Sequence, residues 1–154
     1  MPTVPRGPAL KRPGDLTGAR LVGKVYARWA HLPDYHFRAL GRMALRSLDD
    51  PTPLYPAATY WGGREYLARC WPQPFPEGDT PEDETRRKSI LHKVSLIWRQ
   101  LRAEGACEIV KGDRLPGPGL RQTFLLTLDN DPTGAIARMR DEENARRAAR
   151  KEAA

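Results

Sequence analysis

Side chains that donate hydrogen bonds gather between residues 86 and 103, where the chain has no carboxylate. A helix here, at 100° per residue, would place four apolar residues in one narrow stripe: Ile90, Val94, Ile97 and Leu101. Leu91 and Trp98 widen that stripe on one side. The opposite face would carry only donors, namely Lys88, His92, Ser95 and Arg99, with Arg102 beside them. Lysine and arginine contact phosphates, and arginine also binds guanine edges, so this face is a candidate surface for a polyanion.

A solvated basic face is the alternative interpretation of the same pattern. Solvated helices usually mix charge signs, with Glu and Lys four residues apart, and no acid is available for that role here. We therefore expect a polyanion partner, with Arg86 and Arg87 contacting phosphates at the start of the face. Leu96 is an apolar residue near the outer face, and it could contact a thymine methyl group or a protein partner.

A long helix over residues 81–104 must position these donors. Thr80 is suited to cap the helix, and Pro81 loses no hydrogen bond at the first helical position. The acids at positions 82 and 83 favour the positive end of the helix. Gly105 is the residue type expected just after a helix ends.

The elements before this helix are shorter. Leu21, Val25, Ala27 and Trp29 follow a period of two, which predicts a short strand or extended segment over 20–29. An amphipathic helix is expected over 33–48, with a core face made of Phe37, Leu40, Gly41, Ala44, Leu45 and Leu48. A short strand at 60–61 and a helix over 64–71 follow, with three residues of the helix buried: Tyr66, Leu67 and Cys70. The glycines at 62 and 63 make either a tight turn or a phosphate contact.

After Gly105 the pattern predicts a β-hairpin with strands near 107–111 and 123–128 and a glycine-rich tip at 112–120. Three cations flank or occupy this tip: Lys111, Arg114 and Arg121. Such a tip can place arginine in a minor groove, and an ordinary solvated turn is the alternative.

The two ends of the chain differ from its middle. Residues 1–19 alternate prolines with cations, which predicts a disordered basic arm that could also lie along phosphates. Residues 131–154 are expected to form a basic tail that is helical from residue 134. Ile136 and Met139 are nearly its only large apolar residues, so this helix should be solvated or face a partner.

Composition limits the classes of function. The chain has 154 residues and a net charge of +7, and arginine outnumbers lysine 20 to 6. That excess suits nucleic acid, although a GC-rich genome would also produce it. We expect a cytoplasmic protein without a membrane segment, because no stretch approaches the ~20 apolar residues that a span needs. The two cysteines lie apart and should be core residues rather than a disulfide.

Catalytic motifs are missing from the sequence. It contains no phosphate-binding glycine loop, no metal-ligand spacing and no nucleophile elbow. The three histidines are scattered, so we expect no enzyme, no cofactor and no small-molecule substrate.

The order of helix, short strand, helix, longer helix and hairpin resembles that of winged helix-turn-helix proteins. The segments YWGGREYLARCW, RRKSILHKVSLIWRQLRAEGACEIVKG and LRQTFLLTL look like winged-helix proteins of actinobacterial plasmids and phages. The resemblance covers roughly residues 25–130, and it departs from the family in the loop at 72–80, which is longer than a simple helix-turn-helix turn.

The resemblance implies an α+β fold over residues 20–130, with a three-helix core, a C-terminal β-hairpin wing and an added C-terminal helix. It also implies sequence-specific binding of double-stranded DNA by a transcriptional regulator or replication-origin binder of a phage or mobile element. The helix at 81–104 would lie in the major groove, and the wing at 107–128 on the backbone or in the minor groove. Such a protein would be nucleoid-associated, in the host cytoplasm if phage-encoded. The alternative is a winged-helix interaction module whose C-terminal helix forms a homodimer or recruits a protein partner.

Overall fold

The first helix, α1 (Ala19–Arg28), occupies the segment where the sequence pattern predicts a strand. The computed structural model describes residues 18–53, 56–69, 73–110 and 122–154 of the chain. Leu21, Val25 and Trp29 are buried at four-residue spacing, whereas Ala27 is exposed. The prediction of a strand was therefore wrong, because the buried residues follow the helical period and not the period of two.

A distant carboxylate holds the start of α1. The two oxygens of Asp49 accept hydrogen bonds from the backbone N–H groups of Arg20 at 3.1 Å and Leu21 at 3.0 Å. Gly18 is buried, and a Cβ there would overlap the carbonyl oxygen of Ala44. Gly18 and Ala19, which we expected to belong to the disordered arm, are therefore part of the fold, and the rest of that expected arm, residues 1–17, lies outside the described residues.

Helix α2 (Asp34–Leu45) begins directly after Pro33 and ends three residues earlier than expected. Leu40, Ala44 and Leu48 are buried, as the amphipathic pattern predicts. Leu45 was wrongly placed in the core, since 43% of it is exposed. Leu45 follows the buried Ala44 and points instead toward the surface between α1 and α2.

The short strand β1 (Thr59–Tyr60) and the helix α3 (Gly63–Arg69) follow. The hydroxyl of Tyr60 donates to the carbonyl oxygen of Gly63 at 2.7 Å, which ties the strand to the start of the helix. Leu67 is buried and Tyr66 is half-buried. Cys70, which we expected in the core, lies outside the described residues.

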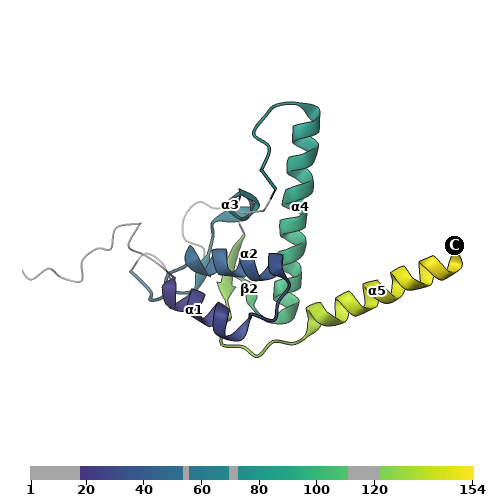
Figure 1. The fold of residues 1–154 in the computed structure, drawn as a ribbon. Coiled ribbons are helices and arrows are strands. Elements are labelled where there is room, and N and C mark those ends of the chain that lie inside the picture. The colour runs from purple at the N-terminus through teal and green to yellow at the C-terminus, as the bar shows by residue number, and fades with distance from the viewer. Residues whose placement is uncertain (1–17, 54–55, 70–72, 111–121) are drawn as a thin grey trace, which may run out of the picture.

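Helix α4 (Pro81–Glu104) has the limits that the sequence predicts. Thr80 caps it, since its Oγ1 accepts a hydrogen bond from the backbone N–H of Asp83 at 3.1 Å. Gly105 ends it in the left-handed conformation at φ 90°. The predicted stripe is buried, together with Trp98. The ring centroids of Trp98 and Phe124 lie 4.5 Å apart. Figure 1 shows that the N-terminal part of α4 extends beyond the other helices.

Strands β2 (Cys107–Val110) and β3 (Thr123–Leu126) form the predicted antiparallel hairpin. β3 also pairs with β1, so the sheet has the order β1-β3-β2. The indole Nε1 of Trp29 donates to the carbonyl oxygen of Leu128 at 3.0 Å, which joins α1 to the end of β3. The described residues thus form an α+β fold of five helices and one three-stranded antiparallel sheet.

The last helix, α5 (Ala135–Ala153), agrees with the prediction of a C-terminal helix. Ala135 and Ile136 are buried, and from residue 137 onward every residue of the helix is exposed. It points away from the rest of the molecule (Figure 1). Across the described parts of the chain, no helix has both the length and the apolar character needed to cross a membrane.

Candidate nucleic-acid interface

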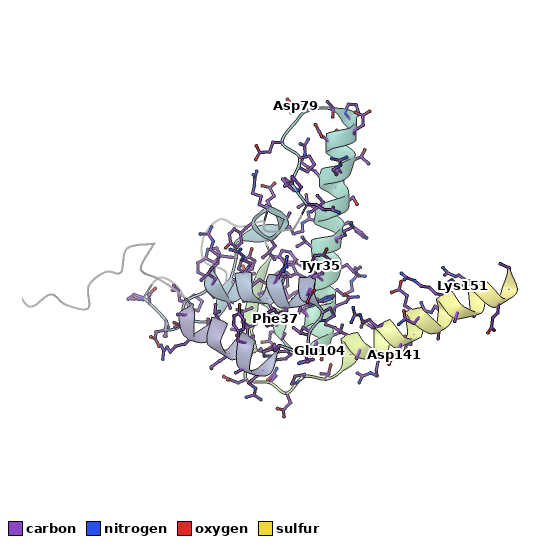
Figure 2. The ribbon with its side chains drawn as sticks, viewed as in Figure 1. Tyr35, Phe37, Asp79, Glu104, Asp141 and Lys151 are labelled. Atoms are coloured by element: carbon purple, nitrogen blue, oxygen red, sulfur yellow. The ribbon has the colours of Figure 1, made fainter. Side chains whose placement is uncertain are left out.

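The outer face of α4, opposite the buried stripe, presents the cations that the sequence analysis selected. His92 and Arg99 are exposed, and the side chain of Lys88 is 76% exposed. Leu96 lies on the same side and is 41% exposed. Asp79 marks the tip of this projecting region and Glu104 its base (Figure 2). The face is therefore accessible along most of the length of α4.

Most of these donors have no partner within the described part of the chain. Arg86, His92 and Arg99 form no side-chain hydrogen bond or ion pair with any described residue. Lys88 differs, because its Nζ lies 3.2 Å from Oε1 of Glu84 one turn earlier. Both of these side chains are mostly exposed, and such helical pairs contribute only about 0.3–0.5 kcal/mol. A phosphate can therefore displace Glu84 at little cost.

Arg87 has a structural role at the edge of this face. Its Nη1 donates to the carbonyl oxygens of Pro76 at 3.0 Å and Gly78 at 2.6 Å. These bonds fasten the loop before α4 to the second turn of that helix. The phosphate contact expected of Arg87 stays a prediction for its other guanidinium nitrogens.

Arg64 is a member of the face that sequence reasoning missed. It lies in the first turn of α3 and is exposed, and its Nη1 donates to Oγ of Ser95 at 3.2 Å. The bond brings a further cation beside the outer face of α4. Its position depends on how α3 packs against α4, and no local pattern in the sequence reports that packing.

Arg102 is exposed in the last turn of α4, next to the start of β2. Its charge lies close to the thiol of Cys107, where it opposes a stronger effect, namely the burial that raises the pKa of Cys107 to about 12. This free, buried thiol stays protonated at neutral pH and behaves as a core residue.

The remaining expected donors, Lys111, Arg114 and Arg121, lie outside the described residues.

The two ends of α4 differ in charge. Glu82, Asp83 and Glu84 occupy its first turn, where they stabilise the positive end of the helix dipole. The same acids would repel a phosphate backbone, so the surface suited to a polyanion begins at about Lys88.

No protein-family model, no curated protein and no solved structure matches this chain.

Proposed function

We propose that this chain is a winged-helix protein that binds double-stranded DNA with the outer face of α4 in the major groove. The element order and the sheet order β1-β3-β2 are compatible with that fold. In this assignment α2, α3 and α4 are the three core helices, and β2 and β3 are the wing.

One observation carries the proposal: an exposed row of donors lies directly opposite a fully buried apolar stripe on the same helix. Lys88, His92 and Arg99 are exposed, whereas Ile90, Val94 and Leu101 are at most 2% exposed. Packing therefore fixes the rotation of α4 and keeps these three cationic or donor side chains pointing outward. A fixed helix face of this kind is what major-groove recognition requires.

The expected division of work follows from the chemistry of each group. Arg64 and Lys88 would neutralise phosphates, which supplies affinity and makes binding depend on salt. The phosphate contact expected of Arg86 stays a prediction apart from this face, because two residues place Arg86 about 200° around the helix from Lys88. His92 and Arg99, which follow Lys88 on the same face, would contact base edges. Ser95, already bonded to Arg64, would hold that arginine in place.

A double variant tests the proposal. Lys88→Ala with Arg99→Ala removes two exposed charges and no buried contact, so the fold should be retained. Binding to DNA sites selected from a random duplex library, measured by gel shift, should weaken about 30-fold or more if each contact contributes ~1–3 kcal/mol. The slope of log K against log salt should fall by about 0.9 for each phosphate contact removed.

Arg38→Ala with Arg42→Ala is the matched control. It removes the same number of exposed charges from α2, on a different face, and should leave the affinity within about threefold of wild type. Equal losses in both double variants would mean that only net charge matters, and wild-type affinity in the α4 variant would refute the proposal.

A protein-interaction module is the second candidate function, and the position of α5 favours it. Beyond its first turn every residue of this helix is exposed, and the ion pairs there that the described residues form, such as Glu143 with Arg147 at 2.8 Å, lie on its surface. A helix of this kind could form a homodimer or bind a partner protein. That function would need residues 134–154 and would not need Lys88 or Arg99.

A further inference from the structure

A groove of about 370 Å³ runs between α1 and α2, and no residue of α4 lines it. One wall is a row on α1, Val22 and Tyr26, and the other is a row on α2, Phe37, Gly41 and Leu45. The rings of Tyr26 and Phe37 meet edge-to-face with their centroids 5.1 Å apart. The groove is therefore built from two packed helices rather than from a loop.

The walls of this groove are apolar and open to solvent. Tyr26 is 65% exposed and Leu45 is 43% exposed, while Val22 and Phe37 are half-buried against the core. Single exposed apolar residues are ordinary, but these residues line one continuous depression. Apolar residues that are contiguous and exposed make this depression a candidate docking surface.

The rim of the groove is positively charged. Arg38 and Arg42 lie on α2 beside the apolar row, both exposed, and neither forms an ion pair with a residue that the structure describes. The cations of α1 behave differently, because Lys24 and Arg28 pair with Asp129 and Asp131 at 3.0 Å. None of the described residues that line the groove is acidic, so its rim is complementary to carboxylates.

Gly41 in the wall of the groove is not required by the fold itself. It lies inside α2, where glycine is less stable than alanine, and its φ is not in the left-handed region. A Cβ at this position would meet no atom within 4 Å. Glycine is needed at such a site when a second backbone approaches closely from outside.

We propose that the α1–α2 groove binds an acidic amphipathic helix of a partner protein. The apolar side chains of that helix would lie between Tyr26 and Leu45, its carboxylates would pair with Arg38 and Arg42, and its backbone would approach Gly41. A second copy of this chain fits poorly, since facing grooves would oppose arginine with arginine. Duplex DNA has no apolar face for this depression, so the proposal is independent of the DNA-binding face on α4.

Two designed peptides test the proposal on the full, ¹⁵N-labelled chain. They share one helical pattern of leucines, and one carries glutamate at its polar positions where the other carries lysine. The glutamate peptide should shift the amide resonances of Val22, Tyr26, Gly41 and Leu45, and the lysine peptide should not. Arg38→Glu with Arg42→Glu should remove the shifts caused by the glutamate peptide.

A pair of glycine variants separates docking from stability. Gly41→Ala and Gly23→Ala both add a methyl group in open space inside a helix, so both should raise the melting temperature. Only Gly41→Ala should weaken the binding of the glutamate peptide, raising its Kd about tenfold, because Gly23 does not line the groove. Equal affinities in the two variants, or peptide shifts confined to α4, would overturn the proposal. Shifts of the groove amides on addition of duplex DNA would overturn it as well.

Discussion

One buried carboxylate at the end of α4 caps the start of α5, and this contact gives a quantitative prediction. Glu104, the last residue of α4, is 1% exposed. Its Oε1 accepts a hydrogen bond from the backbone N–H of Gly134 at 3.0 Å, and its Oε2 accepts one from Ile136 at 2.8 Å. Oε1 also lies 3.4 Å from Nε2 of His31. Glu104 thus caps α5 from the end of another helix.

Replacing Glu104 should lower the free energy that holds α5 against the end of α4 by several kcal/mol. A hydrogen bond to a charged group contributes about 1.5–3 kcal/mol, so Glu104→Ala, which removes both, should cost about 3–6 kcal/mol. Glu104→Gln keeps the shape but turns an amide N–H₂ toward one of the two donors. It should therefore cost about 2–3 kcal/mol, close to the loss of one such bond.

Two measurements should locate the effect. Urea unfolding followed by tryptophan fluorescence, to which the buried Trp29 and Trp98 contribute, reports the core, and hydrogen exchange of the α5 amides reports the junction. We expect α5 to lose most of its protection in Glu104→Gln. Glu143→Gln is the control, because that exposed residue only pairs with Arg147, and its loss should cost under about 0.5 kcal/mol. If Glu104→Gln matches wild type in both measurements, Glu104 does not anchor α5.

Two further predictions concern pH and backbone conformation. Burial lowers the pKa of His36 below 6.5, and Arg140 adds to this effect while Gln100 and Glu104 oppose it. Because the unfolded chain then binds more protons, stability should be complete above about pH 6.5 and fall as the pH drops toward the folded pKa. The urea midpoint of the wild type should show this slope between pH 5 and 8. The midpoint of His36→Gln should vary less with pH, whereas the same slope in both proteins would mean that His36 does not cause it. Gly105→Ala forces alanine to φ 90° and should cost about 1 kcal/mol in the same assay, whereas an unchanged midpoint would argue against strain there.

The ends of α4 could be predicted from sequence because their determinants are local. Thr80, Pro81 and Gly105 lie within one or two residues of the helix ends that they define. The buried stripe also follows from spacing alone, since the residues repeat with the helical period inside one element. The same is true of the hairpin and of the helix near the C-terminus.

The segment over α1 could not be predicted in this way because it fits two periods. Leu21, Val25 and Trp29 are four residues apart, which is a multiple of two as well as a helical spacing. What stabilises the start of the helix is Asp49, 28 residues beyond Leu21, and no local window contains that contact. The glycine at position 23 lowers the helix propensity further, so tertiary contacts decide the conformation.

The candidate site shows the same limit. The exposure of Lys88, His92 and Arg99 follows from the stripe on the opposite side of α4. The contact of Arg64 with Ser95 depends on the packing of two helices, and that of Arg87 with Gly78 depends on the path of the preceding loop. These contacts are set by tertiary structure, so sequence spacing alone could not reveal them.

The charge sequence along α4 restricts where a duplex would contact it under the DNA-binding proposal. The acids of its first turn stabilise the helix but would repel a polyanion, and Glu84 offsets part of the positive charge of Lys88. Arg87 meanwhile ties the preceding loop to the second turn of the helix through two hydrogen bonds. Contacts would therefore centre on the turns from Lys88 to Arg99, beside Arg64, because only there do exposed donors, a fixed helix rotation and a lack of acids coincide.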